Sequence, residues 1–280
     1  IKMSLSVRFI HSLYMSAPSK KDFLHRLIYS KIDAITSSSE ILNERIKKNY
    51  PVPESKVHLL RYGRDQNDFE KNSQESLFIR QILNAKKNDF VFATMCRLDS
   101  AKGVREIAES LLHLSQVVKE QIKIWIMGEP TLLYTNEFGN PVYEEQSLEL
   151  YEWLKNFVEQ NKNSIELIPF QKNIQPFLDA MDVFILATYK ETYSLSVLDA
   201  MCAGIPVIGT NSGGTPEQVK NLERGFLVEP KSAKSIAEAI TYYVENKIMI
   251  QEHGQAAKLW VRQEHDWNKT ILQLKKLYST

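Results

Sequence analysis

The chain has 280 residues, 43% of them apolar and 10% aromatic, so it can bury one large core or two modest ones. A formal net charge of +1 provides no broad positive surface for nucleic acid, and no apolar run is long enough to span a membrane. The two cysteines match no metal or redox spacing and no signal peptide opens the sequence, so we expect a cytoplasmic protein with at most peripheral contact at the inner face of a membrane.

Short apolar runs alternate with helical segments at the start of the chain. Strands are predicted at 5–10, 32–36 and 57–60, and helices at 20–29 and 40–48. Ser37, Ser38 or Ser39 can cap the second of these helices. His11 follows the first strand, where a lone histidine is more often structural than functional. Alternating strands and helices indicate an α/β fold with parallel strands.

A polar segment, 66–87, carries an amphipathic piece at 77–83 and leads into a second unit. Further strands are predicted at 90–95, 122–127, 165–168, 183–187, 206–209 and 226–228, and late helices at 233–245 and 249–263. This alternation is typical of a doubly wound sheet. The polar insertion 130–146 is longer than most loops of such units; it is either a lid or a surface excursion, and we favour the excursion.

The loop and helix after strand 183–187 carry two carboxylates. A polar turn contains Glu191, Ser194 can cap the following helix, and Gly204 is placed to end it. Asp199 lies eight residues after Glu191, so two turns of helix could aim both carboxylates into one crevice. Carboxylates accept hydrogen bonds from vicinal hydroxyls, so a sugar or a ribose is the expected partner.

The next strand, 206–209, runs into Gly213 and Gly214. We expect Thr215 to cap a helix that begins at Pro216, with Gln218 completing a capping box. Two strand ends therefore each lead to a loop and a helix N-terminus. At that edge of a parallel sheet helix N-termini favour phosphate, which predicts a nucleotide or another phosphorylated ligand.

A basic loop follows strand 90–95. Arg97 and Lys102 flank the loop, which opens a helix, so two cations and free backbone N–H groups could converge on a diphosphate. A solvated loop with ordinary surface charges is the alternative.

The stretch from Glu191 to Asp199 resembles the Glu-x7-Glu signature of retaining, nucleotide-sugar-dependent glycosyltransferases of the GT-B fold, the family-4-like "glycosyl transferases group 1". The resemblance implies two Rossmann-like doubly wound domains. The donor-binding domain would cover 73–266; residues 1–72 would be the C-terminal part of an acceptor-binding domain, with 267–280 as a returning helix. Gly63-Arg64-Asp65 matches the turn that ends that domain in the family. The family's glycine-rich acceptor loop is not found, so we expect the first half of the domain to lie upstream of Ile1.

The resemblance also implies residue roles. Arg97 and Lys102 would stabilise the departing nucleoside diphosphate, and Glu191 would contact the donor sugar; these three form the expected catalytic set. Expected donor-binding residues are Asp199 at the ribose, Lys172 and Asn173 near the base, His11 facing the sugar, and Tyr193, Ser194, Leu195, Ser196 and Gly214. Cys96, Ser194 and Asp199 replace two glycines and a glutamate of the family pattern. No metal or cofactor is expected.

The expected reaction moves a sugar from a UDP- or GDP-sugar to the hydroxyl of a sugar or lipid-linked acceptor, with retention of configuration, in cell-surface polysaccharide or glycoconjugate synthesis. The alternatives are a GT-B nucleotide-sugar epimerase, which needs no acceptor, and a non-catalytic nucleotide-sugar-binding subunit, which the three replaced residues make plausible. A nicotinamide-dependent dehydrogenase is set aside because G-x-G-x-x-G is absent from the strand ends.

Overall fold

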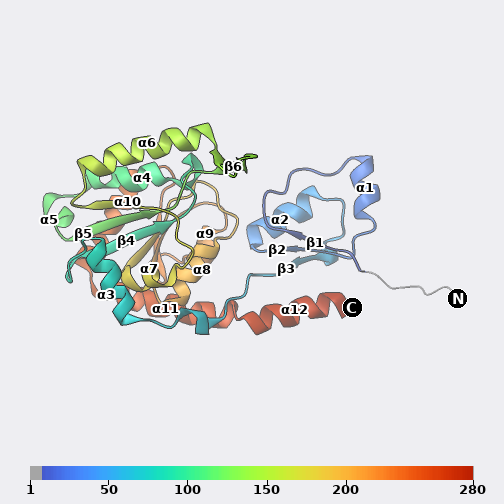
Figure 1. Cartoon of the computed structure of the whole chain (residues 1–280). Coiled ribbons are helices and arrows are strands. Elements are labelled where there is room, and N and C mark those ends of the chain that lie inside the picture. The colour runs from blue at the N-terminus through green and yellow to red at the C-terminus, as the bar shows by residue number, and fades with distance from the viewer. Residues whose placement is uncertain (1–7, 280) are drawn as a thin grey trace.

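The computed structural model describes residues 8–279 and divides into two lobes (Figure 1). The smaller lobe is built on a three-stranded sheet and the larger lobe on a six-stranded sheet. The strand pairs of both sheets are parallel. The predicted α/β class is therefore confirmed.

The smaller lobe holds its strands in the order β1-β2-β3. Its elements are β1 (Ile10–Leu13), α1 (Phe23–Tyr29), β2 (Ala34–Ser37), α2 (Glu40–Asn49), the 3-10 turn Glu54–Lys56 and β3 (Val57–Leu59). Ser39 caps α2 by accepting a hydrogen bond from the Leu42 N–H at 3.3 Å. Burial of Ile35, Leu42 and Ile46 between sheet and helices forms the core of this lobe.

The first strand differs from the prediction. Residues 5–7 lie outside the described part of the chain, and β1 runs from Ile10 to Leu13, paired residue for residue with β2 from Ala34 to Ser37. His11 therefore lies within the strand rather than after it. Pairing with β2, which begins two residues later than expected, sets this register, and the apolar run alone did not indicate it.

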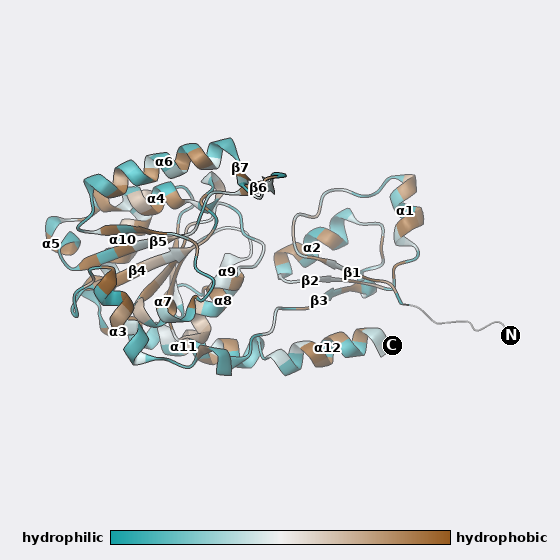
Figure 2. Cartoon of the chain, viewed as in Figure 1, coloured by the Kyte–Doolittle hydropathy of each residue, from teal (hydrophilic) through white to brown (hydrophobic). Residues whose placement is uncertain are grey.

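The larger lobe is a doubly wound sheet in the order β11-β10-β9-β4-β5-β8. Its strands are β4 (Phe90–Met95), β5 (Ile122–Met127), β8 (Ile165–Ile168), β9 (Val183–Leu186), β10 (Val207–Thr210) and β11 (Gly225–Val228). In Figure 2 these strands are largely brown, whereas α6 carries teal residues along its outer side. Apolar strands enclosed on both faces are what a parallel sheet requires.

Helices cover both faces of this sheet. They are α3 (Ser73–Ile82), α4 (Val104–Glu109), α5 (Gln116–Lys119), α6 (Glu145–Gln160), α7 (Gln175–Ala180), α8 (Leu195–Cys202), α9 (Thr215–Gln218), α10 (Ala233–Glu245) and α11 (Ile248–Glu264), with 3-10 turns at Gln66–Phe69, Ser100–Lys102 and Ser110–His113. One core cluster joins Ile107, Leu154 and Ile240 of α4, α6 and α10. A second cluster, on the opposite face, joins side chains of α3, α7, α8 and α11, so the amphipathic part of the polar segment 66–87 packs as a helix of this lobe.

The predicted cap of α8 is confirmed and the capping box at α9 is wrong. Ser194 accepts a hydrogen bond from the Val197 N–H at 3.4 Å, and Gly204 ends α8 with φ +80°. At α9 the N-cap is Gly214 without a side-chain bond, and the buried Thr215 hydroxyl has no partner among the described residues. The Gln218 amide instead pairs with the backbone N–H and C=O of Ser194, both at 2.8 Å. The Gln218 side chain, which local spacing assigned to the helix cap, thus forms a tertiary contact instead.

Two chain segments cross between the lobes. The segment after β3 passes the end of α11, where the Arg64 N–H donates to the His265 carbonyl at 2.7 Å. From there α12 (Trp267–Ser279) leaves the larger lobe and runs alongside the smaller one (Figure 1). A Cβ at Gly63 would lie 2.7 Å from the Trp267 Cα, so the two segments pack too closely for a side chain there. We call this crossing, residues 61–66 with 264–267, the hinge.

The insertion 130–146 folds as an antiparallel hairpin, β6 (Leu132–Thr135) and β7 (Pro141–Tyr143). It leaves the carboxyl end of β5 and projects toward the smaller lobe (Figure 1). The side chains of Leu132, Leu133, Tyr134 and Phe138 are exposed, whereas those of Val142 and Tyr143 are half-buried.

Candidate functional site

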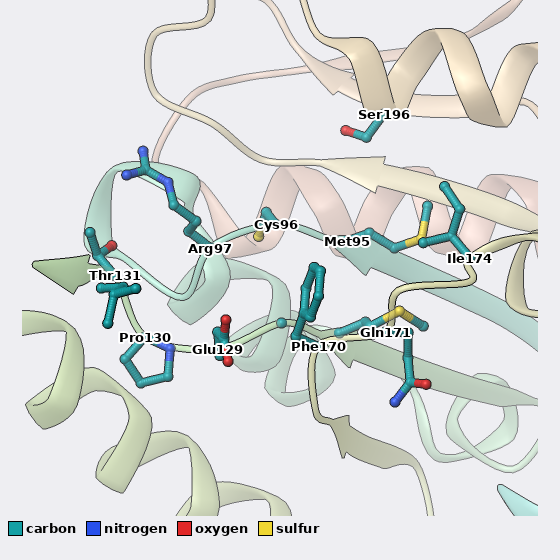
Figure 3. A pocket seen from close by; sticks show the side chains of 13 residues that line it. Met95, Cys96, Arg97, Glu129, Pro130, Thr131, Phe170, Gln171, Ile174 and Ser196 are labelled. Carbon is teal, nitrogen blue, oxygen red and sulfur yellow. The ribbon is translucent and has the colours of Figure 1, made fainter. Parts of the chain in front are cut away.

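A cavity of about 430 Å³ lies at the carboxyl ends of β4, β5 and β8 (Figure 3). Its walls include the apolar side chains of Met95, Met127, Phe170, Ile174 and Leu132. Arg97, Glu129, Gln171 and Ser196 are among the polar residues that line it. A mostly apolar slot with a few polar groups suits a planar ring that carries hydrogen-bonding edges.

The two cations of the basic loop have different neighbours. Arg97 lines the cavity; its side chain is 63% exposed and its guanidinium lies 3.5 Å from the Asp99 carboxylate. Lys102 ends the 3-10 turn and donates to Glu191 Oε2 at 3.1 Å, with both side chains about four-fifths buried. The loop thus places one exposed charge at the cavity and one partly buried charge beside the Glu191 carboxylate.

The loops after β9 and β10 are locked together by the glycine pair. Gly213 has φ +60°, and a Cβ on it would lie 2.0 Å from the Glu191 carbonyl oxygen; a Cβ on Gly214 would lie 1.9 Å from that of Thr192. The Gly214 N–H donates to the Glu191 carbonyl at 2.9 Å. The Thr192 hydroxyl in turn donates to the Tyr14 carbonyl of the smaller lobe at 3.0 Å. Glu191 is therefore held where the two lobes meet.

The residues predicted at the start of α8 divide between core and cavity. Tyr193 is buried, and its hydroxyl contacts His265 Nε2 at 2.9 Å and Arg61 Nη1 at 3.1 Å; burial raises the pKa of this phenol. Ser194 is buried at the N-cap, whereas Leu195 is exposed. Ser196 alone of these four lines the cavity.

Asp199 lies one turn further along α8 and faces the hinge. Its Oδ1 accepts a hydrogen bond from Arg64 Nε at 2.5 Å. Burial raises the pKa of this carboxyl, and the Arg64 charge opposes the shift. Among the described residues, those that line the cavity do not include Asp199.

Lys172 and Asn173 lie at the edge of the cavity, whereas His11 packs within the smaller lobe. Lys172 and Asn173 are exposed in the loop after β8, between the cavity residues Gln171 and Ile174. Asn173 Oδ1 accepts from the Gln175 N–H at the start of α7. His11 stacks on Tyr29 of α1 with ring centroids 5.9 Å apart, and burial lowers its pKa.

One polar residue of the interface was not indicated by any sequence pattern. The Glu217 carboxylate accepts hydrogen bonds from the backbone N–H groups of Glu40 at 2.9 Å and Ile41 at 3.0 Å, at the N-terminus of α2. Arg61 Nη2 lies 3.4 Å from the same carboxylate. A partner so distant in sequence leaves no local signal.

Within residues 8–279 no three His, Cys, Asp or Glu side chains are grouped closely enough to hold a metal ion. None of the helices described there combines the length and the apolar character that a membrane crossing requires.

The two α/β lobes, each built on a parallel sheet, define a protein of the GT-B fold. A solved structure of HepE from Anabaena, in complex with UDP and glucose, superimposes with a TM-score of 0.82 over 98% of this chain and 72% of that one, at 17% identity. The family model "Glycosyl transferases group 1" matches residues 75–260, and the chain belongs to that family.

Two curated relatives are similar over most of this chain. A capsular polysaccharide biosynthesis glycosyltransferase of Staphylococcus aureus is 26% identical over 88% of this chain and 61% of its own length. An Escherichia coli enzyme named as a UDP-galactose:GlcNAc-diphosphoundecaprenol α-1,3-galactosyltransferase is 26% identical over 73% of this chain and 49% of its own length. The chain thus spans roughly half to three-fifths of these relatives.

Proposed function

We propose that this protein transfers a sugar from a UDP-sugar to an acceptor hydroxyl with retention of configuration. The observation that carries the proposal is the arrangement at the β4 and β9 ends: Arg97 beside the cavity, and Lys102 paired with Glu191 where the lobes meet. The cavity would take the base, and the diphosphate would extend along the basic loop toward Glu191. UDP is the choice supported by the ligand of the Anabaena structure and by the donor in the name of the Escherichia coli relative.

The proposed step exchanges one bond at the anomeric carbon for another. The bond from that carbon to the β-phosphate oxygen breaks, and the acceptor oxygen attacks from the same face. The acceptor proton passes to the departing phosphate oxygen, and UDP leaves. Negative charge develops on the diphosphate as the bond breaks, and Arg97 and Lys102 would stabilise it there.

Glu191 has two parts in this proposal. In the free protein it balances the charge of Lys102 at 3.1 Å, which reduces the cost of holding that cation partly buried. With donor bound, Lys102 would turn to the diphosphate and the carboxylate would accept hydrogen bonds from sugar hydroxyls. Because these two cations supply the positive charge, we propose that transfer needs no divalent metal, and EDTA should leave the rate unchanged.

For the acceptor we propose a sugar carried on a lipid diphosphate, as in the name of the Escherichia coli relative, in the synthesis of a surface polysaccharide or glycoconjugate. Such a protein would work at the cytoplasmic face of the membrane through peripheral contact.

The first test is binding of UDP, GDP and ADP, followed by release of UDP from UDP-sugars with and without acceptor. We expect UDP to stabilise the protein by about 2.7 kcal/mol at one hundred times its Kd. Arg97→Ala should abolish this stabilisation. Arg105→Ala, which removes an arginine of α4 paired with Glu109 outside the cavity, should not abolish it.

The other outcomes have separate meanings. Binding of GDP in place of UDP would change only the identity of the donor. Binding without transfer to any acceptor would indicate a non-catalytic subunit, and conversion of the sugar without acceptor would indicate an epimerase.

A further inference from the structure

The carboxylate at the ribose position of the family signature is already engaged by the hinge. Asp199 Oδ1 and Arg64 Nε are 2.5 Å apart, and the two side chains are only 17% and 20% exposed. Charge-assisted hydrogen bonds between an arginine and a carboxylate are among the stronger ones in proteins. A ribose hydroxyl would have to compete with a buried cation for this carboxylate.

Within the hinge, Arg64 is held by its neighbours on both crossing segments. Its N–H donates to the His265 carbonyl at 2.7 Å, its backbone forms a bridge with Asp266, and its Nη1 donates to the Gly63 carbonyl at 3.1 Å. The Arg64 to Asp199 bond therefore ties α8 of the larger lobe to the segment that joins the lobes.

The surroundings of Asp199 favour keeping this pair intact. The Cys202 sulfur, one turn along α8, accepts a hydrogen bond from Gln66 Nε2 at 3.2 Å, and burial together with the Asp199 charge raises the pKa of this thiol. Arg64 is the cation whose charge acts on the Asp199 carboxyl and opposes the effect of burial. Removing Arg64 would leave a buried carboxylate without a partner, which is costly.

Ser196, unlike Asp199, lies in the wall of the cavity. In Figure 3 it projects from α8 on the side opposite Glu129 and Gln171. Its hydroxyl lies 3.0 Å from that of Ser194, which already accepts the Val197 N–H. The Ser194 proton can thus be donated to Ser196, which leaves the Ser196 proton free for a ligand oxygen.

We propose that Ser196 binds a ribose hydroxyl of the nucleotide in this protein, and that Asp199 is a positioning residue that anchors the hinge through Arg64. The inference rests on the proposed function, since it names the residue that recognises the ribose of the donor. It also gives a physical reason for aspartate in place of glutamate: the shorter side chain reaches Arg64 and stops short of the cavity.

The ribose half is tested by titrating UDP, 2′-deoxy-UDP and 3′-deoxy-UDP against the wild type, Ser196→Ala and the Arg64→Met/Asp199→Ala double variant. We expect the wild type to prefer UDP over one deoxy analogue by about 5-fold, the value of one hydrogen bond. Ser196→Ala should remove that preference, and the double variant should keep it. Loss of the preference in the double variant but not in Ser196→Ala would overturn the proposal, as would equal binding of the three nucleotides by the wild type.

The hinge half is tested without nucleotide by a thermal unfolding cycle of Arg64→Met, Asp199→Ala and the double variant. Each single change should lower the Tm by about 2–4 °C or more. The Tm of the double variant should be no lower than that of the less stable single variant. Asp182→Asn, which breaks the ion pair with Arg80 at the opposite end of the sheet, is the matched control. Its effect on the Tm should be additive with that of either hinge variant. Additive losses for Arg64 and Asp199 would contradict the anchor.

The two failures can be told apart. A wild type that binds none of the nucleotides contradicts the proposed function and the Ser196 assignment together. A wild type that binds UDP with the same deoxy preference after Ser196→Ala contradicts this inference alone.

Discussion

The Lys102 ammonium lies 3.1 Å from the Glu191 carboxylate, although the two residues are 89 positions apart in the chain. The close packing of the glycine pair under the Glu191 loop holds the carboxylate there. The sequence patterns predicted that Lys102 contacts a diphosphate and Glu191 a sugar. In the folded protein the two side chains form an ion pair with each other.

Lys102→Ala should lower kcat by about 100-fold or more, because it removes a charge aimed at the leaving diphosphate. Steady-state rates with a UDP-sugar and acceptor measure this. Lys102→Arg keeps the charge and should recover part of the rate, and circular dichroism should show unchanged secondary structure in both. Normal turnover of Lys102→Ala would remove Lys102 from the catalytic set.

Glu217→Ala should destabilise the protein by about 0.5–2 kcal/mol, the usual loss when a helix N-terminus loses its side-chain cap. The reason is that two N–H groups of α2 lose the carboxylate that crosses from the larger lobe. Urea unfolding measures the change, with Glu223→Ala as an exposed control. UDP affinity should stay constant because Glu217 does not line the cavity. Equal stability of the two variants would show that the cap contributes nothing.

Gly213→Ala should cost clearly more than Gly139→Ala. Both glycines have positive φ, +60° and +78°, so alanine is strained by about 1–2 kcal/mol at either position. At Gly213 the new Cβ would also lie 2.0 Å from the Glu191 carbonyl oxygen, whereas nothing lies within 4 Å at Gly139. Denaturant midpoints of the two variants measure the loss of stability. Equal losses of stability in Gly213→Ala and Gly139→Ala would contradict the close packing under Glu191.

Stability should fall as pH drops through the range set by His265. Burial lowers the pKa of this imidazole to about 4 from an ordinary 6.5, and its ring contacts the Tyr193 hydroxyl and the Tyr62 carbonyl. The unfolded chain takes up the proton first, so the neutral folded form loses its advantage progressively from about pH 6.5 to about pH 4. The loss attributable to this group is roughly 3 kcal/mol. Urea denaturation of the wild type and of His265→Gln at several pH values isolates the contribution of this imidazole to the free energy of unfolding. If the free energies of unfolding of the two proteins fall in parallel with pH, the assignment is contradicted.

Most of the fold could be predicted from the sequence because its signals are local. The central strands β4 and β5 begin and end as their apolar runs indicated, and Ser194 caps α8 as predicted. Of the three candidate serines before α2, the cap is Ser39. β1 was placed wrongly because a short apolar run fits several registers, and only pairing with β2 selects one. The site roles of Arg97, Lys102 and Glu191 stay predictions until the variants are measured.

The sequence by itself determined the α/β class, the two strand ends that carry the charged loops, and the membership signature from Glu191 to Asp199. Apolar periodicity, glycines and caps act over a few residues, so they can be recognised without knowing the fold. Only the tertiary structure decided which partner each polar group takes. Gln218 binds the Ser194 backbone instead of capping α9, and Asp199 pairs with Arg64 away from the cavity. Buried polar groups take the partner that packing brings within reach, and for these groups that partner lies 24 and 135 residues away.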